Sequence, residues 1–555
     1  MSQALSLFQQ HEATLKSAIA AIHDRGFWTP YPEHPKAYGE NGDEEGKAAF
    51  SRMMNEDFKE LLQEGEMGYI GEEVSPYLQL GLGIRYPKFS AEDLVIKAAE
   101  QRKAWGNTDK DSRAGILIEA LNRVQARFFE IAYATMHTTG QSFIMSFQAS
   151  GPHANDRALE AVAVAYDELS RIPAKKEWVK PMGKFEIRLD KNWKAIPKGV
   201  AMVVGCSTFP TWNTVPGMFA SLMTGNPVIV KPHPKAILPI AIFVAELQKV
   251  LKEAGLSPNI CQLAVDVQAD PITKHLAEHP AVKIIDFTGS NSFGEYLEGI
   301  PGKTVFTEKA GVNSCMIDSV KALGPVVQNL AFAISLYSGQ MCTAPQNIFI
   351  PETGIKTAEG TLSYEEVVKA LSEAITGLVH HPKMGAGTLG GIQAEATYER
   401  VKNSASLGGK VLVASEAIIN PEFEGARVAS PALIELSASD ASTYFGECFG
   451  PIAFVIKTRN SEESLLLMKE AAAEKGAITC AVYCTDEAMM EEIESEMNEV
   501  FTPVSFNFTG AIFVNQHAAF SDFHVTGGNN AGNASFANPD FVNRRFVWVG
   551  NRRIK

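Results

Sequence analysis

The sequence contains no long hydrophobic run and few cysteines. No stretch of about 18 apolar residues occurs along the 555 residues, so no transmembrane helix is expected. Residues 1–15 are mixed and polar, without the basic and apolar regions of a secretory signal. The seven cysteines are odd in number and scattered, which is typical of reduced thiols and not of a disulfide framework. These absences predict a cytoplasmic protein.

Basic residues are not in excess either. The chain has 50 Lys and Arg against 64 Asp and Glu, a formal net charge of −14. Nucleic acids and anionic membrane surfaces attract basic surfaces, so neither is an expected partner. No metal site is expected, because Cys480 and Cys484 lack a second Cys or His pair at ligand spacing. The His380-His381 pair precedes Pro382 and is more typical of a loop.

Hydrophobic periodicity predicts an α/β protein. Segment 198–290 alternates strands and helices, which is the pattern of a doubly wound parallel sheet. The predicted strands are 199–204, 227–231, 260–265 and 282–287, and the predicted helices are 217–224, 238–254 and 271–278. We divide the chain into an N-terminal extension (1–75), a dinucleotide-binding domain (76–307), a catalytic domain (308–505) and a C-terminal tail or oligomerisation segment (506–555).

Other elements are predicted around this alternating region. The helices expected there are 3–22, 91–101 with Ser90 as N-cap, 112–136 and 155–171, followed by a hairpin within 184–196. Residues 25–47 are rich in Pro, Gly and charge and predict a loop, whereas 544–549 predict an edge strand. The extension carries no catalytic motif, so it is assigned a packing or assembly role.

The most informative segment is 339–344 (GQMCTA), which contains Cys342. Glu308 lies 34 residues earlier, within 306–311 (FTEKAG). A thiol and a carboxylate that meet in one cleft indicate covalent catalysis by sulfur with a general base. A single cysteine is more often an inert buried residue, so this interpretation needs further motifs.

Three further motifs supply this support. Segment 287–294 follows an apolar strand, and Gly289, Ser290 and Gly294 there suit an anionic phosphate at a helix start. Lys231 ends the strand 227–231, where ligands bind in α/β sheets. The turn 447–451 (ECFGP) presents an acid and an aromatic ring.

These five motifs, in this order, resemble those of the aldehyde dehydrogenase superfamily over roughly residues 75–520. The resemblance implies a Rossmann-type cofactor domain, an α/β catalytic domain and small oligomerisation elements. It also implies an NADP or NAD cofactor, held without the Gly-x-Gly-x-x-Gly motif that segment 198–290 lacks. Segments 208–213 and 337–342 are similar to the PaaN branch of phenylacetic acid degradation proteins, which implies a semialdehyde substrate.

The resemblance also implies a role for each motif. Cys342 would attack the aldehyde, hydride would leave to the nicotinamide, and Glu308 would activate the water that hydrolyses the thioester. Lys231 would bind the adenosine ribose and Ser290 the pyrophosphate. Glu447 would bind the nicotinamide ribose, with Phe449 near the ring.

The chain departs from the superfamily at three places. Counting back from Lys231 without gaps puts Thr208, and not an asparagine, at the oxyanion position, while the alternative Asn213 lies five residues later. We favour Thr208, because a hydroxyl can donate as an amide does. Residues 309–311 (KAG) replace the usual Leu-Gly-Gly after the base. The acid that often selects NAD is replaced by Pro234, between His233 and Lys235, which favours NADP slightly.

Other functions remain open. A coenzyme A-acylating dehydrogenase would keep the fold, but such enzymes tend to lack the glutamate base. A non-catalytic scaffold and a thiol esterase without nicotinamide are the remaining alternatives. Members of the superfamily form dimers or tetramers, so a homodimer or homotetramer is expected. The sequence leaves the aldehyde and the oligomer number undetermined.

Overall fold

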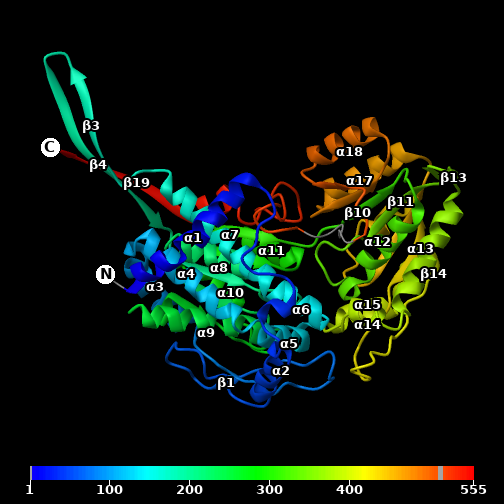
Figure 1. The fold of residues 1–555 in the computed structure, drawn as a ribbon, viewed down its shortest axis with the longest axis horizontal. Helices are drawn as coiled ribbons and strands as arrows, with labels where there is room; N and C mark the ends of the chain where they lie inside the picture. The colour runs from blue at the N-terminus through cyan, green and yellow to red at the C-terminus, as the bar shows by residue number, and fades with distance from the viewer. Residues whose placement is uncertain (1–2, 511–516) are drawn as a thin grey trace.

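The computed structural model describes residues 3–510 and 517–555. The molecule has two lobes, each built on one large sheet, and a thin arm projects from the larger lobe (Figure 1). The N-terminal half of the chain forms most of the larger lobe. The chain then crosses to the smaller lobe and returns at its C-terminal end.

The larger lobe contains a five-stranded parallel sheet in the order β7-β6-β5-β8-β9. Its elements are β5 (Val200–Val204), α8 (Val215–Met223), β6 (Val228–Lys231), α9 (Leu238–Glu253), β7 (Cys261–Leu263), α10 (Thr273–Glu278), β8 (Val282–Thr288), α11 (Asn291–Glu298) and β9 (Thr304–Glu308). The predicted doubly wound sheet is therefore confirmed. The chain runs outward from β5 on one side and then crosses to β8, so a ligand crevice is expected at the carboxyl ends of β5 and β8.

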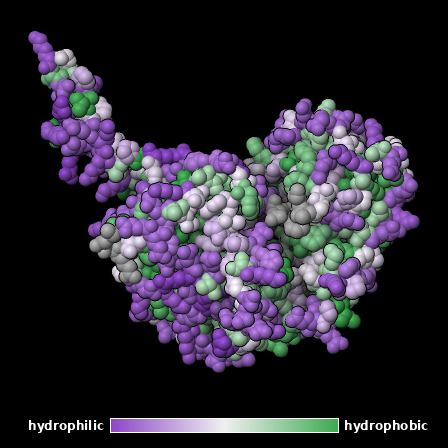
Figure 2. All heavy atoms as spheres, in the orientation of Figure 1, coloured by the Kyte–Doolittle hydropathy of each residue, from purple (hydrophilic) through white to green (hydrophobic). Residues whose placement is uncertain are grey.

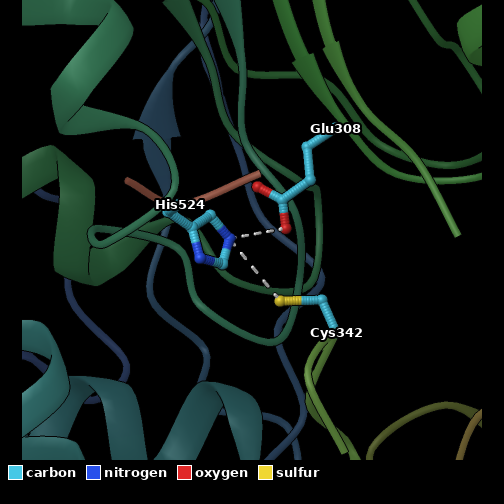
Figure 3. Close-up of side chains that lie close together, drawn as sticks. All are labelled: Glu308, Cys342 and His524. Atoms are coloured by element: carbon cyan, nitrogen blue, oxygen red, sulfur yellow. Dashed lines mark hydrogen bonds and ion pairs between the residues drawn. The ribbon is translucent and has the colours of Figure 1, made fainter. Parts of the chain in front are cut away.

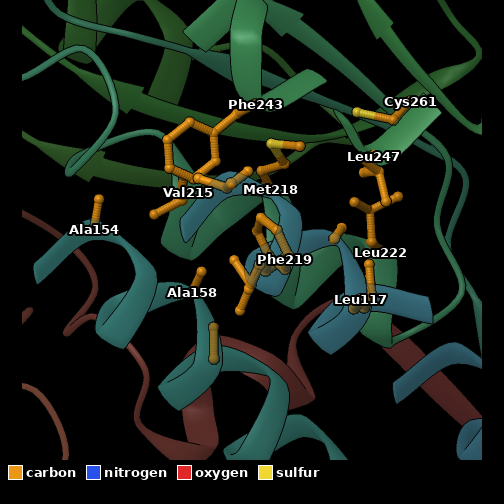
Figure 4. Close-up of a cluster of buried hydrophobic side chains, with 14 of the residues drawn as sticks. Leu117, Ala154, Ala158, Val215, Met218, Phe219, Leu222, Phe243, Leu247 and Cys261 are labelled. Carbon is orange, nitrogen blue, oxygen red and sulfur yellow. The ribbon is translucent and has the colours of Figure 1, made fainter. Parts of the chain in front are cut away.

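Helix α8 is the centre of the large core (Figure 4). All nine of its residues are buried, as expected of a helix that is apolar all round. It shares this core with Leu117, Ala154, Ala158, Phe243, Leu247 and Cys261, which come from four other elements. This packing fixes the loop 205–214, which connects β5 to α8 and faces the crevice.

The N-terminal elements cover this core. They are α1 (Gln3–Asp24), η1 (Pro35–Tyr38), α2 (Gly42–Met53), β1 (Tyr69–Ile70), β2 (Tyr86–Pro87), α3 (Ala91–Asn107), α4 (Lys110–Gln125), α5 (Phe128–Thr139), α6 (Phe143–Ser150) and α7 (Pro152–Ser170). Helix α1 packs on α4 and α7 and shares their core. Ser90 caps α3 as predicted, because its hydroxyl accepts from the Asp93 N–H at 3.1 Å.

Two predictions for this region were wrong in part. The helix expected over 112–136 is two helices, because Arg127 leaves the helical conformation at φ −113°, ψ 14°. Its guanidinium instead binds Glu60, Glu130 and Glu246. The loop expected over 25–47 contains η1 and the start of α2, whose first turn carries three acidic residues that favour a helix N-terminus.

The smaller lobe contains a seven-stranded sheet in the order β14-β15-β16-β11-β10-β17-β18, parallel except for β14. Its strands are β10 (Ser314–Ile317), β11 (Asn347–Pro351), β14 (Lys410–Val413), β15 (Ala432–Ser437), β16 (Ile452–Thr458), β17 (Cys480–Tyr483) and β18 (Val504–Phe506). The main helices are α12 (Leu323–Ser335), α13 (Tyr364–Val379), α17 (Ser461–Lys475) and α18 (Glu487–Glu499). Shorter elements of the smaller lobe are η3 (Leu336–Gly339), β12 (Ile355–Thr357), β13 (Gly360–Leu362), α14 (Gly385–Thr388), α15 (Glu395–Lys402), η4 (Ser404–Leu407), η5 (Ala438–Asp440) and α16 (Ala441–Tyr444). Two further short elements, η2 (Pro258–Ile260) and α19 (Pro539–Asn543), pack on helices of the larger lobe.

The arm is a three-stranded antiparallel sheet of β3 (Lys175–Met182), β4 (Phe185–Pro197) and β19 (Phe546–Ile554). The predicted hairpin within 184–196 was misplaced, since this segment is one long strand. The turn comes earlier, at Gly183, which has φ 70°. The arm is mainly hydrophilic with scattered apolar side chains (Figure 2). Among the described residues, no helix is long and apolar enough to cross a membrane.

Candidate active site

Three side chains from distant parts of the chain converge between the lobes: Glu308, Cys342 and His524 (Figure 3). His524 Nε2 lies 3.2 Å from Glu308 Oε1 and 4.0 Å from Cys342 Sγ. The side chains of His524 and Glu308 are only 2% and 1% exposed. The structure thus brings the predicted nucleophile and base together and adds a histidine that no motif predicted.

Glu308 is the last residue of β9, so it lies at the carboxyl edge of the parallel sheet. Its Oε2 accepts a 2.8 Å hydrogen bond from Asn213 Nδ2, and its Oε1 faces His524. A buried carboxylate needs such partners to offset its lost hydration. The next residue, Lys309, forms an ion pair with Glu298 at 3.1 Å, so the unusual 309–311 segment is anchored on α11.

Cys342 follows a strained loop that ends α12. Tyr337, Ser338 and Gly339 all have positive φ, between 49° and 63°. A side chain at Gly339 would meet the Gly450 carbonyl oxygen at 2.4 Å, so only glycine fits there. Backbone strain of this kind is common at functional sites, where the surrounding structure enforces it.

The Asn313 side chain stabilises the loop that carries Cys342. Its Nδ2 donates to the carbonyl oxygens of Cys342 and Ala344 at 2.7 and 3.1 Å. Its Oδ1 accepts from the N–H groups of Ile478 and Thr479. The side chain therefore ties the nucleophile loop to the segment before β17, a role that sequence reasoning missed.

Protein atoms surround the thiol of Cys342 although the residue lines a cavity. This burial, together with the nearby Glu308 carboxylate, raises the pKa of Cys342 well above its usual range. The cysteine is therefore a thiol at neutral pH and needs a proton acceptor before it can attack. Glu308 and His524 are the nearest candidates among the described residues.

The two candidate oxyanion donors occupy different positions. Asn213 lines the cavity with Cys342, and its Nδ2 donates one of its two hydrogens to Glu308. The hydroxyl of Thr208 points to Cys206 Sγ at 3.8 Å. The geometry favours Asn213 over Thr208 as the donor, although the role itself stays a prediction.

His524 is held by the N-terminal extension. Trp28 packs edge-on against Phe520 at 5.0 Å, and Arg25 lies 4.1 Å over the Phe523 ring. The Ser521 hydroxyl donates to the Arg25 carbonyl oxygen. Residues 25–28 therefore anchor the segment that carries the active-site histidine.

A cavity of about 380 Å³ opens beside Cys342. Its described lining is Glu33, Met145, Gln148, Ala149, His153, Phe209, Trp212, Asn213, Leu336, Met341, Cys342, Thr343, His517 and His524. The volume lies within the usual range of small-molecule sites, about 300–1,000 Å³. The nucleophile thus faces a mostly apolar pocket that can hold a substrate.

Most of the predicted cofactor residues lie at or just beyond the carboxyl ends of β6 and β8. Ser290 is the N-cap of α11, is exposed, and makes no capping hydrogen bond with its side chain. The first-turn N–H groups of α11 are therefore open to an anion, which fits a dinucleotide pyrophosphate. Gly289 precedes this N-cap, and Gly294 packs under the stem of Lys309.

At the far end, Lys231 is buried and lies 2.6 Å from Asp266 Oδ1. His233 is half-buried beside two lysines, and burial with their charge lowers its pKa to about 4, so the ring is uncharged at neutral pH. On the other lobe, Glu447 is exposed in the turn before Gly450, and the Phe449 carbonyl oxygen accepts from Arg400 at 2.7 Å.

The sequence predicted no metal site. Within 3–510 and 517–555, Glu308, Cys342 and His524 form one group whose ligand atoms all lie within 4.8 Å of one another. His380, by contrast, pairs with Glu416. Glu308, Cys342 and His524 are also the groups that an aldehyde oxidation would use. Their proximity therefore does not require a metal ion.

Comparisons with known proteins identify the family of this chain. The Aldehyde dehydrogenase family profile matches residues 85–537. A solved structure, an NAD-dependent aldehyde dehydrogenase from Burkholderia multivorans, is 45% identical, with a TM-score of 0.97 and full coverage of both chains. The 1-pyrroline-5-carboxylate dehydrogenase 1 of Halalkalibacterium halodurans is 25% identical over 79% of this chain and 81% of its own length. A glyceraldehyde-3-phosphate dehydrogenase from Methanocaldococcus jannaschii, solved with NADP, shares the fold at 16% identity, with a TM-score of 0.69 over 88% of this chain and 100% of that one.

The chain therefore belongs to the aldehyde dehydrogenase family. It is an NAD(P)-dependent oxidoreductase that acts on aldehydes. The predicted superfamily, fold class and nicotinamide cofactor are confirmed. The branch, the substrate, the roles of the individual residues and the choice between NAD and NADP stay predictions.

Proposed function

We propose that this protein oxidises an aldehyde to a free carboxylic acid through a thioester on Cys342. The observation that carries the proposal is the position of Glu308, which shares one buried hydrogen-bonded cluster with Asn213 and His524 beside the thiol. A general base next to the acyl position favours hydrolysis. The alternative of transfer to coenzyme A lacks a supporting feature in the described residues.

The residues then act in a fixed order. Cys342 loses its proton to the Glu308–His524 pair, and its sulfur bonds to the aldehyde carbon, giving a thiohemiacetal. Asn213 Nδ2 and the Cys342 N–H hydrogen-bond the oxyanion. The bound nicotinamide supplies the hydride acceptor. After the pair has released its proton to solvent, Glu308 takes a proton from water, the hydroxide attacks the thioester carbon, and the C–S bond breaks to release the acid. Glu308 then returns its proton to the Cys342 sulfur.

For the cofactor, we propose that both NAD and NADP bind and that NAD binds better. The sequence favoured NADP because Pro234 replaces an acid and two cations flank it. However, His233 is uncharged at neutral pH, and the Asp266 carboxylate lies beside Lys231. A 2′-phosphate there would meet a carboxylate, which disfavours NADP.

We further propose a semialdehyde of phenylacetate breakdown as the physiological substrate, on the resemblance of segments 208–213 and 337–342. A homodimer or homotetramer would form through the arm. Several apolar side chains are exposed there, including Phe185, Val547 and Ile554 at 61%, 52% and 87%. Exposed apolar side chains on a projecting sheet are typical of an assembly surface.

The test is NADH or NADPH formation by the purified protein with aromatic, aliphatic and semialdehyde substrates, with and without coenzyme A. The expected product is the free acid, at the same rate in both conditions. A product that is a coenzyme A thioester would support the acylating alternative. No turnover with any aldehyde, despite measurable NAD binding, would support a non-catalytic scaffold.

A further inference from the structure

The substrate cavity contains no lysine or arginine among its described lining residues. Its ionisable side chains, apart from Cys342, are one carboxylate, Glu33, and three histidines. Glu33 comes from the N-terminal extension, which the sequence assigned to packing or assembly. The extension therefore forms part of the cavity wall. The charges on this wall affect which substrates can bind.

None of the three histidines supplies a free positive charge. His153 Nε2 lies 2.9 Å from Glu33 Oε1, so this pair is at most neutral and adds no net positive charge to the wall. His517 is half-buried beside His524, and the desolvation together with the neighbouring His524 and Arg157 lowers its pKa to about 3, so it is uncharged at neutral pH. His524 faces the Glu308 carboxylate.

Arg157, whose guanidinium lies 5.4 Å from the ring centroid of the lining residue Trp212, is bound to protein groups as well. Arg157 is 1% exposed and lies 2.8 Å from Glu160 Oε2. It also donates to the carbonyl oxygens of His517 and Asp522. Residues 511–516, which lie outside the described part of the chain, contain no charged side chain in the sequence (AIFVNQ).

A substrate carboxylate in this cavity would therefore lose water without gaining a cation, and it would also face Glu33. Burying an unpaired charge is strongly unfavourable. An uncharged substrate body would instead pack on Met145, Phe209, Trp212 and Leu336. Burial of apolar surface of this kind favours binding.

We infer that the cavity selects aldehydes that are uncharged near the carbonyl group and excludes carboxylate-bearing semialdehydes, with Glu33 as a specificity-determining residue. The inference rests on the proposed aldehyde oxidation. It separates this chain from relatives named for 1-pyrroline-5-carboxylate, a compound whose name includes a carboxylate. A semialdehyde whose charged group lies outside the cavity remains compatible with it.

The test compares two aldehydes that differ in one charge, 4-formylbenzoate and its methyl ester, at saturating NAD. We expect kcat/KM for the carboxylate to be about 100-fold lower than for the ester. The pair 6-oxohexanoate and methyl 6-oxohexanoate repeats the comparison on a flexible chain. Equal values of kcat/KM within both pairs would overturn the inference.

Charge reversal tests the role of Glu33 separately. Glu33→Lys should raise the carboxylate-to-ester ratio of kcat/KM about tenfold, because it replaces the repulsive charge with an attractive one. Glu40→Lys makes the same change on an exposed residue of the extension that does not line the cavity, and the ratio should stay at the wild-type value. If Glu33→Lys does not fold, Glu33→Gln should move the ratio in the same direction by a smaller factor.

Failure of the role of Glu33 and failure of the proposed function give different results. A low wild-type ratio that Glu33→Lys leaves unchanged would remove Glu33 from the inference. If neither the ester nor the acid is oxidised while calorimetry shows NAD binding, the proposed function fails, and with it the basis of the inference.

Discussion

The cluster around Cys342 and the surroundings of Lys231, where we propose that the adenosine binds, are built in different ways. At the reaction centre, Glu308 accepts from Asn213 and faces His524, so the reacting groups are oriented before a ligand binds. At the proposed adenosine end, Lys231 forms an ion pair with Asp266 at 2.6 Å. Changes at the centre should therefore lower kcat, whereas changes at the crevice should mainly alter cofactor affinity.

The largest effect is expected from the nucleophile. Cys342→Ala should lower kcat by roughly 10⁴-fold or more, because no other described thiol lines the cavity. Steady-state rates of NADH formation measure this loss. Cys484→Ser is the matched control, since that thiol is buried at the end of β17 and should leave kcat unchanged. A Cys342→Ala variant with wild-type turnover would remove covalent catalysis from the account.

The second-largest effect is expected at Asn213, one of the two candidate oxyanion donors. Asn213→Ala should lower kcat by about 10²–10³-fold, the usual cost of a lost oxyanion donor. Thr208→Val should have a much smaller effect, because its hydroxyl contacts Cys206. Parallel kinetics of the two variants decide between them. A large effect of Thr208→Val and a small effect of Asn213→Ala would instead support Thr208 as the oxyanion donor, the residue that the sequence favoured.

A pH dependence follows from the raised pKa of Cys342. Below that pKa the residue is a thiol, so the reactive thiolate fraction should grow about tenfold per pH unit as the pH rises. The rate of alkylation by iodoacetamide between pH 7 and 9, followed at Cys342 by peptide mass spectrometry, should rise throughout. A plateau below pH 8 would indicate a thiolate that is stabilised, contrary to the described environment.

His524 should matter less than Cys342, because Glu308 remains as a proton acceptor for the thiol in its absence. His524→Ala should lower kcat by about 10²-fold, while His524→Gln should recover most of the loss, because its amide can still donate to the carboxylate. The pH profile of kcat should shift in the alanine variant and return with glutamine. Wild-type kinetics in both variants would show that the contact is only structural.

The smallest effect is expected at the adenosine end. Asp266→Asn should improve the affinity for NADP relative to NAD about tenfold, because it removes a carboxylate beside the 2′ position. Calorimetric Kd values for the two cofactors measure this change without turnover. A thermal melt controls for the unpaired Lys231 that the variant leaves. A ratio that does not change would place Asp266 away from the cofactor.

Features that depend on neighbouring residues in the chain could be predicted from the sequence. The strands and helices of the larger sheet follow from local periodicity, and the motifs at their ends located Glu308, Lys231 and Ser290. These positions depend on neighbouring residues in the chain. The break at Arg127 was missed because its three acidic partners include Glu60 and Glu246, which lie far away in the sequence.

The partners of the motif residues were missed for the same reason. His524 reaches Glu308 across 216 positions of sequence, and Asn313 reaches the cysteine loop across 29. Asp266 meets Lys231 only after β6 and β7 pair. Glu33 enters the cavity wall through a loop with no motif at all. Long-range contacts of this kind leave no local pattern.

The most direct test of the account is to trap the thioester on Cys342. In Glu308→Gln, the first half of the reaction should proceed while hydrolysis slows, so the acyl group should accumulate on the protein. Intact-mass spectrometry after one turnover with NAD and an aldehyde should show one added acyl mass, located at Cys342 by peptide analysis. An NADH burst without any added mass, or acylation at another residue, would contradict the proposed roles of Cys342 and Glu308.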